Sequence, residues 1–124
     1  MTNVVAPIRV ARRLVEHVRE HTGVLAFMSS ILGSVAVPDG EEICLYKASK
    51  AALNSMINSF VVAQQRHDLC VLAMHPGWVK TDMGGENAEI DVLTSTRGML
   101  EQIKAQGGTA GLRFINYKGE PLVW

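Results

Sequence analysis

Three side chains of this 124-residue sequence have types and spacings that suit proton transfer. Tyr46 and Lys50 are four residues apart, so a helix over this segment puts them on one face. An ammonium beside a phenol favours the phenolate and lowers the phenol pKa from about 10, which makes the tyrosine a usable general acid or base. The hydroxyl of Ser30 can hold a carbonyl oxygen on which charge develops. Together they suit the interconversion of a carbonyl and an alcohol, for which a cofactor must supply the hydride.

The hydrophobic pattern predicts the elements that position these residues. Helices are expected over 4–20, 45–66 and 92–106, and the short apolar runs at 24–28, 69–74 and 112–117 are typical of buried parallel strands. Strands that alternate with helices imply right-handed crossovers and a parallel sheet. The sequence therefore predicts an α/β fold with about three parallel strands. Because such sheets bind ligands at the carboxyl ends of their strands, the site is expected directly after the first two strands.

Three short strings occur in order, each after an expected strand or at a helix start. They are MSSILG at 28–33, YKASKAALN at 46–54 and HPGWVKTDM at 75–83. Together they resemble the short-chain dehydrogenase/reductase family along essentially the whole chain, and the ending at 117–124 also resembles its carbonyl-reductase branch of sniffer-like and C-factor-like proteins. The resemblance implies the C-terminal half of a Rossmann-like, doubly wound parallel sheet. Residues 1–124 are then a single partial domain, the catalytic half, without the family's Gly-rich T-G-x-x-x-G-x-G turn.

The resemblance also implies a role for each matching residue. Tyr46 would donate the proton, Ser30 would polarise the carbonyl, and Lys50 would bind the nicotinamide ribose and lower the tyrosine pKa. Asn3 would hold a water in a proton relay. The residues expected at the cofactor are Tyr46, Lys50, Pro76, Gly77, Val79 and Thr81, and those expected at the substrate are Ser30, Ile31 and Trp78. The implied cofactor is NADP or NAD, with NADP preferred, and the implied substrate is a small carbonyl compound or alcohol.

Some of these residues have alternative interpretations. Ser29 could satisfy backbone groups at the strand end, and we favour Ser30 over it as the catalytic serine. The separation of Ser30 from Tyr46 is longer than is usual in the family, which indicates an insertion at 38–42 and a variant substrate loop. Trp78 could line the substrate pocket or cover the core.

Other features are more readily explained as structural. His75 is expected to be structural rather than a ligand, and Gly84-Gly85 could hinge a lid or form a passive loop. Cys44 and Cys70 lack a metal-binding spacing, so no metal site is expected, and a cytoplasmic protein with reduced thiols is the simplest interpretation.

The composition argues against several other classes of protein. Twelve basic and twelve acidic residues cancel without a block of one sign, so no nucleic-acid surface is expected. No apolar run approaches the roughly 20 residues that span a bilayer, and no signal peptide is visible. The helices at 4–20 and 45–66 carry small-residue faces, and the resemblance implies a homodimer through them, although these faces could also pack only on the sheet.

Two functions therefore remain open. The first is an NAD(P)-dependent oxidoreductase that acts on CH–OH groups. The second is a truncated, catalytically inactive fragment that acts, if at all, as a binding or signalling module. Without the Gly-rich turn and the helix that follows it, the pyrophosphate has no binding site, so this chain alone is expected to bind the cofactor weakly. Its sheet would also expose an unpaired edge.

Overall fold

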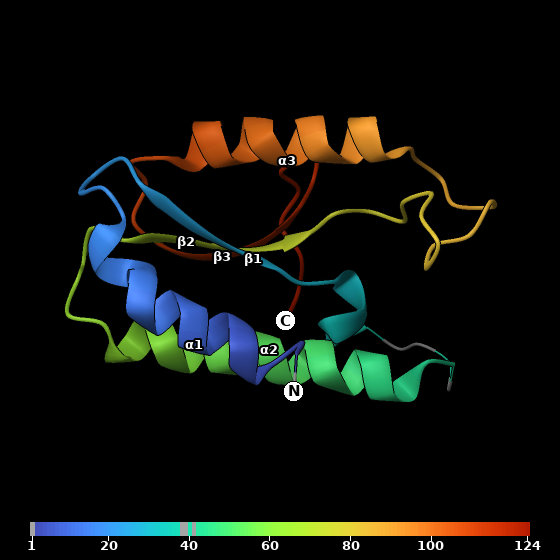
Figure 1. Cartoon of the computed structure of the whole chain (residues 1–124), viewed down its shortest axis with the longest axis horizontal. Coiled ribbons are helices and arrows are strands. Elements are labelled where there is room, and N and C mark those ends of the chain that lie inside the picture. Colours follow the sequence, from blue (N-terminus) through green and yellow to red (C-terminus); the bar gives the residue numbers. More distant parts are fainter. Residues whose placement is uncertain (1, 38–39, 41) are drawn as a thin grey trace.

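Three parallel strands form the centre of the structure, a computed structural model that describes residues 2–37, 40 and 42–124. The strands β1 (Val24–Met28), β2 (Cys70–His75) and β3 (Gly111–Asn116) lie side by side in that order. Helices α1 (Val5–Leu14) and α2 (Cys44–Ala63) cover one face of the sheet, and α3 (Val92–Gln106) covers the other (Figure 1). This arrangement confirms the expected α/β fold, a Rossmann-like parallel sheet with helices on both faces. Of the expected insertion at 38–42, residues 38, 39 and 41 lie outside the described residues.

The central strand β2 is buried on both faces, as its continuous apolar run predicted. Val71 and Ala73 face the cluster beneath α1 and α2, whereas Leu72 and Met74 face α3. The register places Met28 of β1 opposite Met74. The two strands therefore end at the same level, and the segments that follow them leave the sheet side by side.

The helical pattern at 4–20 predicts an apolar stripe of Val4, Ile8, Leu14, Val15 and Val18. Ile8 and Val15 are buried as predicted, whereas Leu14 is 50% exposed. The small side chain of Ala11, which the pattern did not include, packs in the core beside Ile8 and Val15.

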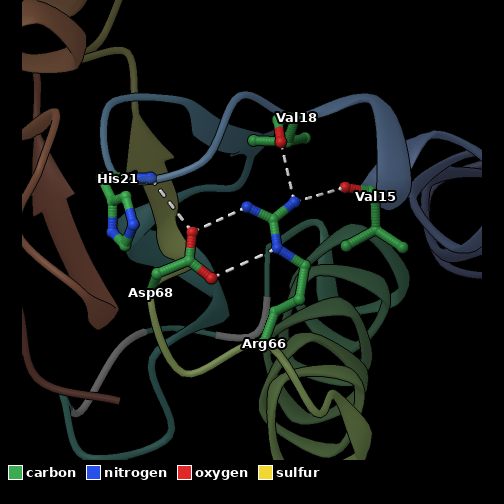
Figure 2. Close-up of polar contacts among 5 residues, drawn as sticks. All are labelled: Val15, Val18, His21, Arg66 and Asp68. Carbon is green, nitrogen blue, oxygen red and sulfur yellow. Dashed lines mark hydrogen bonds and ion pairs between the residues drawn. The ribbon is translucent and has the colours of Figure 1, made fainter.

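A single arginine joins the turns at the amino ends of the strands. Figure 2 shows the guanidinium of Arg66 donating to the carbonyl oxygens of Val15 (2.9 Å) and Val18 (2.8 Å). Arg66 also pairs with the carboxylate of Asp68 at 2.8 Å, and that carboxylate accepts the backbone N–H of His21. We call these four interactions the Arg66 clamp. It connects the turn before β1 to the turn before β2.

Two helices are shorter than predicted, and the clamp accounts for the end of the first. The helix expected over 4–20 ends at Leu14 and continues as a single 3-10 turn, Val15–His17. The helix expected over 45–66 ends at Ala63. The carbonyls of Val15 and Val18 accept bonds from Arg66, so helical bonding is not needed to satisfy them. Among the described residues, no helix is long and apolar enough to cross a membrane.

Candidate active site

A cavity of about 550 Å³ opens at the carboxyl ends of β1 and β2. Its volume is within the range of small-molecule pockets, roughly 300–1,000 Å³. Most of the side chains that the resemblance implicates line it, namely Ser30, Ile31, Tyr46, Pro76, Gly77, Trp78, Val79 and Thr81. The fold therefore brings together three segments that are far apart in the sequence.

Ser29 and Ser30 follow β1 and have different partners. The hydroxyl of Ser29 is buried and donates to Oδ1 of Asn54 on α2, at 2.5 Å. Ser30 caps the short 3-10 turn Ile31–Gly33, because its Oγ accepts the N–H of Leu32 at 3.1 Å. As that bond uses a lone pair of the oxygen, the Ser30 hydrogen can be donated into the cavity. The structure thus places Ser30, and not Ser29, at the cavity wall.

Tyr46 and Lys50 lie on one face of α2, one turn apart. The ammonium of Lys50 is 5.7 Å from the centre of the Tyr46 ring and donates to the carbonyl oxygen of Met28 at 2.9 Å. Lys50 is only 8% exposed, and this burial lowers the pKa of its ammonium. Tyr46 lines the main cavity, whereas Lys50 lines a separate groove of about 360 Å³ beside β1.

Asn3 lies in the groove that Lys50 also lines. Its side-chain amide donates to Oγ of Ser49 at 3.2 Å, and the Ser49 hydroxyl donates to the carbonyl of Tyr46 at 2.7 Å. The asparagine is therefore connected to the first turns of α2, behind the tyrosine. Its predicted part in a proton relay stays a prediction.

The segment after β2 folds into a closed loop at the cavity mouth. Gly77 has φ +89°, and a β-carbon there would lie 2.7 Å from Cδ1 of Ile90, so this turn requires glycine. The indole of Trp78 is half exposed and donates to the carbonyl of Gly84 at 2.8 Å. Thr81 accepts the Gly84 N–H at 3.1 Å. These bonds hold Trp78 and Thr81 at the wall of the cavity.

Several further residues line the cavity to which the resemblance gave no role. Ser95 is buried in α3 and donates to the carbonyl of Pro76 at 2.6 Å. The His75 side chain also lines the cavity, and burial lowers the pKa of its imidazole, which favours the neutral ring. Within the described part of the chain, Nδ1 of His75 has no hydrogen-bond partner. The remaining such residues are Leu32, Ile43, Met83, Gly84, Val92 and Thr96.

The cavity suits the nicotinamide end of a dinucleotide cofactor. Its wall is mainly apolar, as a flat ring requires, and the hydroxyls of Ser30, Tyr46 and Thr81 supply polar groups. The sequence contains no T-G-x-x-x-G-x-G string, which is the kind of turn that holds the pyrophosphate of such a cofactor.

Comparison with known proteins agrees with this geometry. The family model described as short chain dehydrogenase matches residues 1–91. The C-signal protein of Myxococcus xanthus is 34% identical over 125 residues, which cover 98% of this chain and 74% of that protein.

Solved structures give the same result. A carbonyl reductase from Pseudomonas aeruginosa in complex with NADP is 41% identical, with a TM-score of 0.89, over 99% of this chain and 53% of that one. A Burkholderia multivorans protein described as a short-chain dehydrogenase/reductase, with bound NADP, is 35% identical, with a TM-score of 0.92 and the same coverage. The chain thus spans about half the length of these structures. It belongs to the short-chain dehydrogenase/reductase family and is similar to carbonyl reductases within it.

Proposed function

We propose that the chain is the catalytic half of an NAD(P)-dependent carbonyl reductase. The observation that carries this proposal is that Ser30 and Tyr46, from separate elements, line one cavity while the Lys50 ammonium lies 5.7 Å from the tyrosine ring. The substrate would be a small carbonyl compound or, in the reverse direction, an alcohol. NADP is the favoured cofactor because the two similar structures described above hold it.

The chain's own residues would handle the proton and the substrate oxygen. Ser30 donates its hydrogen to the carbonyl oxygen, which polarises the bond. The Tyr46 hydroxyl delivers its proton to that oxygen as charge develops, and the nearby Lys50 charge stabilises the tyrosinate that remains. When bound, the nicotinamide supplies the hydride. Pro76, Gly77, Val79 and Thr81 would hold the nicotinamide end of the cofactor.

A shortened hydride donor gives a direct test. The residues proposed to hold the nicotinamide end line the cavity, and the sequence contains no Gly-rich string for the pyrophosphate, so reduced nicotinamide mononucleotide should reduce a simple aldehyde such as benzaldehyde about as well as NADPH does. Tyr46→Phe should lower kcat/KM by roughly 100-fold or more, because general acid catalysis typically contributes 10²–10⁴-fold. Tyr117→Phe is the matched control, since it removes the other tyrosine hydroxyl. A rate that survives Tyr46→Phe would refute the assignment.

The alternative function is favoured by one observation, the lack of a Gly-rich string for the pyrophosphate. The chain would then act by binding a partner. Titration calorimetry with NADP and with reduced nicotinamide mononucleotide separates the two proposals. Binding of the mononucleotide at the cavity, abolished by Thr81→Val together with Gly77→Val, supports the reductase. Absence of binding for both compounds, together with no turnover, supports the partner-binding function.

We also propose that the chain forms a homodimer in the cytoplasm through α1 and α2. These helices carry exposed apolar side chains that a partner could cover, notably Val10 (54%), Leu45 (85%) and Val62 (78%). Sedimentation velocity should give a dimer for the wild type and a monomer for Leu45→Glu combined with Val62→Glu. A monomeric wild type would contradict the proposal.

A further inference from the structure

Helix α2 contacts the chain at the end of β1 through side chains that are four residues apart. Tyr46, Lys50 and Asn54 are four residues apart and so form one stripe along the helix. Lys50 donates to the carbonyl of Met28, and Asn54 accepts the hydroxyl of Ser29. Successive turns of α2 therefore hold successive residues of the chain as it leaves the sheet.

The turn after Ser30 is held against the same helix. Gly33 packs on the backbone of Lys50, where a β-carbon on the glycine would lie 2.8 Å from the lysine carbonyl carbon. Ser30 thus lies between two attachments to α2, the Ser29–Asn54 bond before it and the Gly33 contact after it. Tyr46 lies on this helix too, so the attachments fix the serine relative to the tyrosine.

We propose that Ser29 and Asn54 are a positioning pair that sets the Ser30 hydroxyl opposite Tyr46; this inference rests on the proposed reductase function. Both side chains are almost completely buried, at 2% and 4% exposure. In such surroundings a lost hydrogen bond is not replaced by water, so the 2.5 Å bond strongly constrains the Ser29 side chain. Because Ser29 precedes Ser30 directly, a rotation of its backbone redirects the next side chain.

The unused amide nitrogen of Asn54 supports this interpretation. Among the described residues Nδ2 of Asn54 has no hydrogen-bond partner, although the atom is buried. A buried amide with an unsatisfied donor is a cost to stability. An asparagine is therefore not the most stabilising choice here, and its value lies in the oxygen that it directs at Ser29.

Two spectroscopic signals of the folded chain report the geometry without any turnover. The Leu32 amide donates to Ser30 Oγ, so its hydrogen exchange reports whether that serine keeps its place. The chain has two tyrosines, and incorporation of 3-fluorotyrosine gives one fluorine signal for Tyr46 and one for Tyr117 as an internal reference. Tyr117→Phe assigns the two signals.

The variants are Ser29→Ala, Asn54→Ala and the double change Ser29→Ala with Asn54→Leu. Each should speed exchange of the Leu32 amide by about tenfold, the equivalent of one lost hydrogen bond, and should shift the Tyr46 fluorine signal but not that of Tyr117. Ser29→Thr keeps the hydroxyl, so it should show the wild-type rate of Leu32 amide exchange and the wild-type Tyr46 fluorine signal. If a single change unfolds the chain, the double change should keep it folded, because it replaces both partners of the Ser29–Asn54 bond by apolar groups.

The outcomes are clear-cut. A folded double variant with wild-type Leu32 exchange and a wild-type Tyr46 signal would overturn the proposal. Ser59→Ala, which removes an exposed α2 hydroxyl bonded to the carbonyl of Ser55, should change neither signal. In the aldehyde assay, Ser29→Ala should lower kcat with little change in KM. If the wild type shows no turnover, the proposed function fails, while the exchange and fluorine data still decide whether Ser29 and Asn54 set the position of Ser30.

Discussion

The ammonium of Lys50 is bonded to a neutral backbone oxygen, that of Met28, at 2.9 Å. The lysine is 8% exposed, so its charge is removed from water at the point where β1 ends. A carbonyl dipole compensates a buried charge only in part. The structure thus holds a costly cation 5.7 Å from the Tyr46 ring, which supports the proposed role of Tyr46 in proton transfer.

The first prediction concerns stability in alkali. Burial lowers the Lys50 pKa below the 10.5 of the free side chain, so between the lowered pKa and 10.5 the unfolded chain binds more protons than the folded one. The contribution of Lys50 to the free energy of unfolding therefore rises with pH in this window. Denaturant unfolding from pH 8 to 10.5 should show a shallower rise, or a steeper fall, for Lys50→Met than for the wild type. Lys104→Met, at an exposed position, should keep the wild-type slope; equal slopes for all three proteins would contradict the prediction.

The second prediction concerns stability in acid. Hydrogen bonds from Arg66 and from the backbone of His21 hold the pKa of Asp68 well below its usual 3.8. The stabilisation is therefore complete above pH 3.8 and is lost as the pH falls below that value toward the lowered pKa. Asp68→Asn should be less stable at pH 6 and should lose less stability than the wild type between pH 4 and pH 2. The exposed change Asp82→Asn serves as the control, and an unaltered acid profile in Asp68→Asn would count against the clamp.

The third prediction concerns the start of α2. Ile43 precedes the helix with φ +51° and ψ +33°, a left-handed conformation that costs an L-residue about 1–2 kcal/mol. Its side chain is 57% exposed, so little packing is lost on truncation. Ile43→Gly should raise the free energy of unfolding by about 1 kcal/mol, measured by urea denaturation. Ala48→Gly, inside the same helix, should lower it by about 1 kcal/mol. A destabilised Ile43→Gly would show that the conformation is not strained.

The fourth prediction concerns Gly33. A β-carbon there would meet the Lys50 backbone at 2.8 Å, so Gly33→Ala must push the turn away from α2. Overpacking of this kind costs about 1–3 kcal/mol, and we expect a loss of this size in thermal and urea unfolding. Among the described residues, no heavy atom lies within 4 Å of such a β-carbon on Gly40, and Gly40→Ala should stay within about 0.5 kcal/mol of the wild type. Equal stability of the two variants would mean that the turn does not press on the helix.

Local patterns predicted the parallel strands and α3 well, because these elements depend on runs of side chains that are visible in the sequence. The strand at 24–28 and the helix at 92–106 have the predicted bounds, and β2 and β3 differ from prediction by one residue at their ends. Asp91 accounts for the accurate start of α3, since its carboxylate accepts the N–H of Thr94.

What the sequence did not predict depends on tertiary partners. The end of α1 is followed by carbonyls that Arg66 binds from 48 and 51 residues away in the chain. Asn54 ends the string at 46–54 but had no predicted role, and its role appears only once Ser29 lies beside it. The pattern also could not show that Lys50 would lie in a groove of its own while Tyr46 faces the main cavity.

The Arg66 clamp has a consequence for protein engineering. It joins the turns at the amino ends of β1 and β2, whereas the residues that line the main cavity lie around the carboxyl ends of these strands and near the starts of α2 and α3. Loops grafted at the carboxyl ends of β1 and β2 would join strands that the clamp already connects at their amino ends. We therefore expect loop grafting at the cavity to change substrate preference without unfolding the sheet.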